Sequence, residues 1–184
     1  MLEVGDRMLV DSRTAADPEH ALHHVAKLMR RLPVTDLSWI RLAPWRNHLA
    51  GLFDDEANRP FLGGVEVVEV AGHFAPRLLL AGWVSGRLNP APAAVRLRDS
   101  THVSIRITAK HRGRRGHFAV TRPGHGRVIV TKVDLEDSPS QARTLPMRDR
   151  RPARALAEAL SHSDGDDTYN RALVCALALR PGPN

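Results

Sequence analysis

Hydrophobic residues in the first part of the chain recur at helical spacing. Asp17 and Pro18 read as an N-cap followed by proline at the first helical position. Apolar residues then return every three or four positions up to Pro33: Ala21, Leu22, Val25, Leu28, Met29 and Leu32. The pattern predicts an amphipathic helix from residue 18 to about residue 32. A short apolar run at residues 7–10 predicts a buried strand before it.

The next segments alternate between helical and extended patterns. Thr35 or Asp36 can cap a helical segment, and Pro44 starts or kinks a second one that runs to Phe53. The β-branched run at residues 65–70 predicts a strand, with a change of phase between Val67 and Val68 that indicates a bulge. An apolar segment opened by Pro76 predicts a helix to residue 88 that is buried on the sheet.

After residue 92 the hydrophobic period changes from 3.6 to two. Apolar residues alternate with polar and basic ones at 95–98 and 103–110, and further strands are predicted at 118–121 and 128–132. This pattern predicts an antiparallel meander over residues 93–133 with one basic face, made by Arg96, Arg98, Arg106 and Lys110. A polar loop at 134–151 and two helices, at 152–160 and 167–179, follow.

These elements predict an α/β protein with α+β character. We expect a mixed sheet with an antiparallel meander in its second half and helices packed on it. With 184 residues, one domain over 1–184 is expected, made of an α/β part (1–88), the meander (93–133) and the C-terminal helices (152–179). No apolar stretch is long enough for a membrane span, and Cys175 is expected to be a small buried hydrophobe.

Positive charge is concentrated in the meander. The formal net charge is +7. No acidic residue lies between Asp99 and Asp134, whereas eight basic residues do: Arg106, Lys110, Arg112, Arg114, Arg115, Arg122, Arg127 and Lys132. Nucleic acid, acidic protein surfaces and phosphorylated metabolites are therefore candidate partners.

Arg112, Arg114 and Arg115 are the best candidates for binding a phosphate or a carboxylate. Their guanidinium groups match such anions, and the neighbouring glycines let backbone N–H groups approach. Basic glycine-rich hairpin tips also arise from turn geometry and solubility alone, so both interpretations remain open. Nucleic-acid binding is disfavoured because Phe118 is the only aromatic residue between Asp99 and Asp134.

Patterns for catalysis, metals and nucleotides are weak. The sequence has no G-x-S-x-G elbow or glycine-rich nucleotide motif, and Glu66 and Glu69 are placed on opposite faces of a regular strand. His20 and His24 share one helix face, but no third metal ligand is identifiable. We expect both histidines to face solvent, and we expect no enzyme activity, no metal and no cofactor.

Three segments resemble a known family. Residues 8–12 read MLVDS, residues 34–46 read VTDLSWIRLAPWR, and residues 78–88 read LLLAGWVSGRL. In order and spacing they are similar to the C-terminal part of the glucose-6-phosphate dehydrogenase assembly protein family, OpcA. Residues 145–150, the 155–160 segment and Asp167, Tyr169, Ala172 and Leu173 also resemble the end of that family. The resemblance covers most of residues 5–175, and the usual N-terminal portion of the family has no counterpart.

The resemblance implies a non-enzymatic, cytoplasmic protein of the pentose phosphate pathway. It would bind glucose-6-phosphate dehydrogenase and promote its assembly or allosteric activation. The chain could be a minimal form, half of a split pair, or a paralogue with a different partner. The resemblance singles out these residues: Trp39, Arg41, Pro44, Trp45, Arg46, Trp83 and Arg87.

Arg41, Trp45 and Arg46, together with Arg112, Arg114 and Arg115, are the predicted partner-binding residues. A Pro-Trp-Arg turn at a helix start can present a ring and a guanidinium together, and both groups are common at interface hot spots. Trp83, in apolar surroundings, is expected to belong to the core. A nucleic-acid-binding module and a phosphosugar-binding sensor are the alternative functions.

Overall fold

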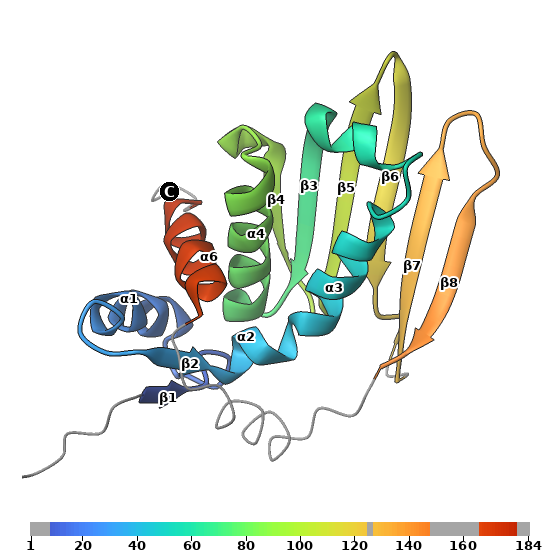
Figure 1. Ribbon diagram of the computed structural model, residues 1–184. Helices are drawn as coiled ribbons and strands as arrows, with labels where there is room; N and C mark the ends of the chain where they lie inside the picture. The colour runs from blue at the N-terminus through green and yellow to red at the C-terminus, as the bar shows by residue number, and fades with distance from the viewer. Residues whose placement is uncertain (1–7, 125–126, 148–165, 180–184) are drawn as a thin grey trace, which may run out of the picture.

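A six-stranded mixed sheet forms the centre of the molecule in the computed structural model, which describes residues 8–124, 127–147 and 166–179 (Figure 1). The strand order is β4-β3-β5-β6-β7-β8. The strands are β3 (Val65–Gly72), β4 (Val95–Asp99), β5 (Ser104–His111), β6 (Arg114–Thr121), β7 (Val128–Leu135) and β8 (Gln141–Pro146). All neighbouring strands are antiparallel except β3 and β4, which are parallel. The predicted fold class, a mixed sheet with helices packed on it, is confirmed.

A smaller sheet and the first helices lie beside one end of the large sheet (Figure 1). β1 (Met8–Val10) pairs in parallel with β2 (Val34–Asp36), and α1 (Pro18–Leu28) connects them. The side chain of Asp17 accepts a hydrogen bond from the backbone N–H of His20, as the predicted N-cap requires. Two short helices follow, α2 (Leu37–Arg41) and α3 (Ala43–Leu52), and Asp36 caps α2.

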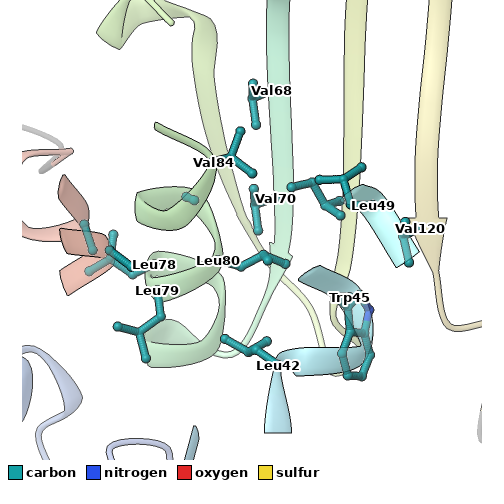
Figure 2. Packing of buried hydrophobic residues seen from close by; sticks show 14 of the residues in the cluster. Leu42, Trp45, Leu49, Val68, Val70, Leu78, Leu79, Leu80, Val84 and Val120 are labelled. Atoms are coloured by element: carbon teal, nitrogen blue, oxygen red, sulfur yellow. The ribbon is translucent and has the colours of Figure 1, made fainter. Parts of the chain in front are cut away.

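The core lies between one face of the large sheet and the helices α3 and α4 (Phe74–Leu88), and α6 (Asp167–Ala178) packs on α4. Alternate strand residues such as Val68, Val70, Ile105 and Ile107 are at most 1% exposed. Leu80 and Val84 of α4 meet this face, and Leu42, Trp45 and Leu49 cover it further along (Figure 2). In β3, β5, β6 and β7 the period of two therefore gives each strand a buried and an open side.

Helices α4 and α6 pack unusually closely because Gly82 lies at their contact. A Cβ atom at Gly82 would lie 2.2 Å from the carbonyl oxygen of Ala172 and 2.6 Å from the backbone nitrogen of Ala176. Only a residue without a side chain allows this approach. The apolar segment predicted to be a buried helix on the sheet thus also holds the C-terminal helix.

Several predicted details differ from the structure. β4 is not part of an antiparallel meander: it pairs in parallel with β3 at the edge of the sheet, because helix α4 connects the two strands as a crossover. The segment 134–151, predicted as a loop, contains β8. The predicted cap at Asp36 is confirmed, but residues 34–36 also form the short strand β2, which was not predicted. The strand irregularity lies between Val65 and Val67, not between Val67 and Val68.

Other predictions concern residues at the ends of the described ranges. The helix predicted at 167–179 is α6, whereas the helix predicted at 152–160 lies outside the described residues. Cys175 is half-buried. None of the helices in the described ranges combines the length and the apolarity that a membrane crossing requires.

Candidate partner-binding surfaces

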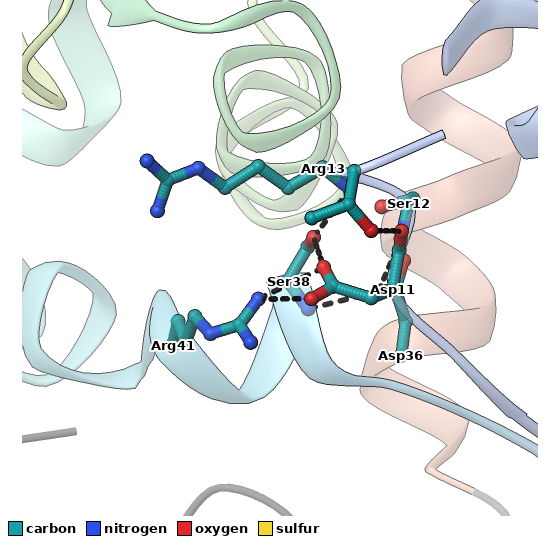
Figure 3. A network of polar contacts seen from close by, with 7 residues as sticks. Asp11, Ser12, Arg13, Asp36, Ser38 and Arg41 are labelled. Atoms are coloured by element: carbon teal, nitrogen blue, oxygen red, sulfur yellow. Dashed lines mark hydrogen bonds and ion pairs between the residues drawn. The ribbon is translucent and has the colours of Figure 1, made fainter. Parts of the chain in front are cut away.

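Arg41 is held in an ion pair between the first strand and the second helix. Its Nη1 atom donates to both carboxylate oxygens of Asp11, at 2.8 and 2.7 Å. The Ser38 hydroxyl donates to the same carboxylate at 3.0 Å and accepts from the backbone N–H of Arg13 at 2.8 Å (Figure 3). The Arg41 side chain is 20% exposed. The guanidinium therefore links the end of β1 to α2.

Asp36 is a fully buried carboxylic acid at the centre of the same region. It accepts hydrogen bonds from the backbone N–H groups of Ser12 (3.2 Å) and Ser38 (2.8 Å) and from the Tyr169 hydroxyl (3.1 Å). Burial raises the pKa of Asp36, and the hydrogen bonds oppose that shift in part. Burial also raises the pKa of Tyr169, and the nearby Asp36 adds to the effect. Tyr169 therefore stays a neutral donor.

Trp39 and Arg46 connect α2, α3 and α6. The indole Nε1 of Trp39 donates to Asp166 Oδ2 at 2.6 Å. Asp166 also caps α6, because its Oδ1 accepts from the backbone N–H of Tyr169. The guanidinium carbon of Arg46 lies 3.4 Å from the centre of a Trp39 ring, within the range of a cation–π interaction. Three segments far apart in the sequence, 11–12, 36–46 and 166–169, thus meet in one polar cluster.

Trp45 belongs to the core rather than to the surface. It is 6% exposed, and its Nε1 donates to the backbone carbonyl of Val103 at 3.0 Å. The expectation that a Pro-Trp-Arg turn presents the ring and a guanidinium together is wrong, because α3 turns the indole onto the sheet while Arg46 lies on Trp39.

Trp83 is half-buried and lines an apolar groove of about 460 Å³ between α3 and α4. Phe53, Leu62 and Leu88 line the same groove, and Arg59 and Arg87 lie at its sides. The ring therefore contributes to the core on one side, as the sequence predicts, and to a surface groove on the other.

The predicted basic loop is the tip of the β5–β6 hairpin. Arg112 and Gly113 both have positive φ values, 49° and 83°, as a two-residue type I′ turn requires. Arg114 pairs with Asp137 at 3.0 Å, and Arg115 pairs with Glu66 at 3.5 Å. Acidic residues distant in sequence therefore neutralise part of the charge that the sequence concentrates at this tip.

The six predicted partner-binding residues form two separate groups. Trp45 contacts Val103, immediately before β5, whereas Arg112 follows the last residue of β5. Strand β5 has eight residues and so spans about 27 Å at the usual rise per residue. One partner contact could include both groups only if it extended along the full length of the sheet.

The second face of the large sheet is left open by every described helix. The strand register aligns two rows of side chains across it. The first row consists of Arg96, Glu69, Arg106, Ala119, Lys132 and Ala142. The second consists of Arg98, Ala71, Ser104, Thr121, Val130 and Thr144. A shorter row, Val67, Thr108, His117 and Asp134, lies between the first row and Lys110. Because most of the uncharged residues are small, we call these rows, together with Lys110, the open sheet face, and expect it to be flat.

Ion pairs satisfy only some of the charges on the open sheet face. Glu69 lies 4.0 Å from Arg96, and Asp134 lies 2.6 Å from Lys132; the lysine lowers the pKa of Asp134. Within the described ranges, no ion pair engages Arg98, Arg106 or Lys110, and all three are exposed. The basic face predicted from the alternation is therefore present.

Histidines and acidic residues form no group of three that could hold a metal ion in the part of the chain that the structure describes. His20 and His24 stack on each other at 6.4 Å and are exposed. Both histidines thus face solvent, as expected from the helical pattern.

The fold is that of a helix-covered sheet with one open face, and its polar cluster joins the motif that ends at Ser12 to the motif at residues 34–46 and to residues 166–169. A family described as the C-terminal domain of a glucose-6-phosphate dehydrogenase subunit matches residues 32–173. Because this match extends over more than half of the chain, the chain belongs to that family.

The chain is also similar to OpcA proteins of two organisms. The OxPP cycle protein OpcA of Synechocystis sp. is 33% identical over 98 residues, which cover 51% of this chain and 21% of the relative. The OpcA protein of Nostoc punctiforme is 29% identical over 106 residues, which cover 55% and 23%. The matched residues thus span about a fifth of these relatives.

Sequence reasoning missed the pairing of Asp36 with Tyr169. Asp36 was recognised only as a helix cap, and 133 positions separate it from Tyr169. One available signal was that Asp36 stands between the apolar residues Val34 and Leu37. The partner could not be found because a hydrogen bond between distant segments leaves no periodic pattern.

Proposed function

We propose that this protein binds glucose-6-phosphate dehydrogenase without catalysing a reaction of its own, and that it promotes assembly or the active state of that enzyme. Membership of the family supports a role linked to the dehydrogenase. The observation that carries the binding part is the open sheet face, where Arg98, Arg106 and Lys110 stand among small side chains with no ion-pair partner in the described ranges.

The open sheet face fits an acidic protein surface. Flat sheets of small residues allow close approach, and cations that are not already paired gain most from an opposite charge in a partner. If one assembly state of the dehydrogenase binds this face more tightly than the others, binding shifts the enzyme toward that state. We include in the same proposal that residues 1–184 form a single domain and that the protein is located in the cytoplasm.

The predicted arginines take different roles in this proposal. Arg112, at the exposed hairpin tip near Lys110, extends the contact surface. Arg114 and Arg115 lie at the edge of that surface, in ion pairs with Asp137 and Glu66. Arg41, Trp45 and Arg46 act as positioning residues, because their polar groups tie α2 and α3 to Asp11, Val103 and Trp39.

A charge-matched pair of variants tests the surface. In the first, Arg98, Arg106 and Lys110 are each changed to Ser; in the control, Lys27, Arg30 and Arg31 are changed to Ser. Both sets are exposed, carry three charges, and lack ion pairs in the described ranges. Binding to purified dehydrogenase is measured over a range of salt concentrations, with enzyme activity and oligomeric mass recorded in parallel.

We expect the open-face variant to weaken binding at least about tenfold and to flatten its salt dependence, while the control keeps both. Equal binding by the two variants would remove the open sheet face from the proposal. Unchanged activity and mass of the dehydrogenase with the wild-type protein would remove the regulatory role. An Arg112, Arg114 and Arg115 to Ser variant tests the hairpin tip in the same assay.

Nucleic-acid binding is the less favoured use of the same charges. The rows of the open sheet face contain no Phe, Tyr or Trp, and their one ring is the imidazole of His117, so the face offers little aromatic surface for base stacking. A gel shift at low salt separates the two functions, because retardation by the wild-type protein but not by the open-face variant would favour nucleic acid.

A further inference from the structure

A polar cleft lies on the helix-covered side of the sheet, away from the open sheet face. It has a volume of about 210 Å³ and lies between α3 and the strands β7 and β8. Helix α3 contributes Asn47 and His48, and the sheet contributes Thr131, Gln141 and Arg143. The cleft exists because the ten-residue α3 lies over β6 and β7 and leaves the inner side of the edge strand β8 uncovered.

The strand register sets the polar groups of the sheet beside one another. Thr131 of β7 is paired directly with Arg143 of β8, and Val133 is paired with Gln141. Side chains at directly opposed positions lie about 5 Å apart at Cβ. Gln141 and Arg143 are two residues apart on one strand, so both point to the same side. The hydroxyl, amide and guanidinium groups of these residues therefore lie close together on the side of the cleft that the sheet forms.

The polar side chains of the cleft have unused hydrogen-bonding capacity. Within the described ranges, no hydrogen bond or ion pair engages the side chains of Asn47, His48, Thr131, Gln141 or Arg143. Thr131 is only 5% exposed, so its hydroxyl lies at the bottom. Asp55, which also lines the cleft, accepts a hydrogen bond from the backbone N–H of Ala57 with one carboxylate oxygen. The other oxygen can accept from a hydroxyl group of a ligand.

The geometry points to a binding site for a small anion that carries several hydroxyl groups, with Arg143 holding the anionic group and the amides and Thr131 holding the hydroxyls. Arginine binds phosphate and carboxylate groups in a bidentate manner. Amide and hydroxyl side chains both donate and accept, as sugar hydroxyls require. The volume is below the ~300 Å³ at which drug-sized sites begin, which favours a monosaccharide-sized ligand over a dinucleotide.

Calorimetric titration of the full chain with four probes tests this site. Glucose 6-phosphate and gluconate are hydroxylated anions with a phosphate or a carboxylate group, inorganic phosphate lacks the hydroxyls, and glucose lacks the charge. We expect at least one hydroxylated anion to bind more tightly than both inorganic phosphate and glucose. The better of the two identifies which anionic group the cleft prefers.

Two variants with matched controls locate the binding. Arg143→Gln should weaken the hydroxylated anion at least about tenfold, because a charge-assisted contact is lost, whereas Arg98→Gln on the open sheet face should leave it unchanged. Thr131→Val, which keeps the side-chain shape, should weaken the hydroxylated anion but not inorganic phosphate. Thr144→Val, on the open side of β8, is its control.

Two results would overturn the site: no heat from either hydroxylated anion at millimolar concentration, or binding that Arg143→Gln leaves intact in a folded protein. Because the cleft and the open sheet face lie on opposite sides of the sheet, the dehydrogenase assay with the Arg98, Arg106 and Lys110 variant succeeds or fails independently of this titration.

Discussion

The two faces of the large sheet are made by the same strands but have opposite properties. On β5, Ile105 and Ile107 are at most 1% exposed beneath the helices, whereas Arg106 and Lys110 point from the other side into solvent. Burial of apolar area makes the first face responsible for stability. On the second face, charges without partners contribute little to folding and remain free to bind. Stability and binding can therefore be changed separately by substituting neighbouring residues of one strand.

The largest effect is expected from Ile107→Ala on the covered face. Removing buried methyl groups and leaving a cavity costs about 2–5 kcal/mol of unfolding free energy. Urea unfolding followed by circular dichroism measures the loss. A cost below about 1 kcal/mol, the usual range for surface changes, would contradict the assignment of this face to the core.

A smaller loss is expected from Gly82→Ala, which tests how closely the covering helices pack. The added Cβ would meet backbone atoms of Ala172 and Ala176, so α4 and α6 must separate. Overpacking of this kind costs about 1–3 kcal/mol. Gly86→Ala is the control, because its Cβ would meet only side chains, the nearest at 3.3 Å. Equal melting temperatures for the two variants would show that the helices are not in close contact.

The buried carboxyl of Asp36 predicts a pH dependence of stability. Its folded-state pKa is raised, so the native state keeps a proton that the unfolded state releases. The stabilisation is complete below the unfolded pKa of about 3.9 and is lost as the pH rises through the higher folded pKa. Asp36→Asn removes the titration and can keep the hydrogen bonds from Ser12 and Ser38.

Urea unfolding of both proteins between pH 4 and pH 8 measures this effect, and the wild type should lose stability relative to Asp36→Asn as the pH rises. Parallel curves would contradict the raised pKa.

Tyr169→Phe removes one hydrogen-bond donor to Asp36 and should lower the free energy of unfolding by about 1–2 kcal/mol.

The smallest effect on stability is expected from Arg106→Ser, next to Ile107 but on the open sheet face. An exposed side chain without an ion pair in the described ranges should change the unfolding free energy by no more than about 0.5 kcal/mol. Binding to the dehydrogenase, in contrast, should weaken measurably at low salt. A stability loss comparable to that of Ile107→Ala would show that the two faces are not functionally distinct.

The sequence by itself determined the elements whose signals are local. The cap at Asp17, the helical spacing through Leu28, the buried helix ending at Leu88 and the alternation along β5 all follow from contacts between residues a few positions apart. The same alternation predicted the basic face, because a period of two fixes which side of a strand each residue occupies. The family motifs at residues 34–46 and 78–88 could also be recognised without coordinates.

Only the tertiary structure decided which distant segments meet. It paired β4 with β3 in parallel, placed Trp45 in the core, and brought Glu66 and Asp137 to the arginines of the hairpin tip. It joined Asp36 to Tyr169 and aligned Thr131 with Arg143 in the polar cleft. Such pairings depend on how helices and strands pack over long loops, and packing energy is shared among many residues. No local periodicity records them, so the candidate surfaces and the cleft became visible only in the folded chain.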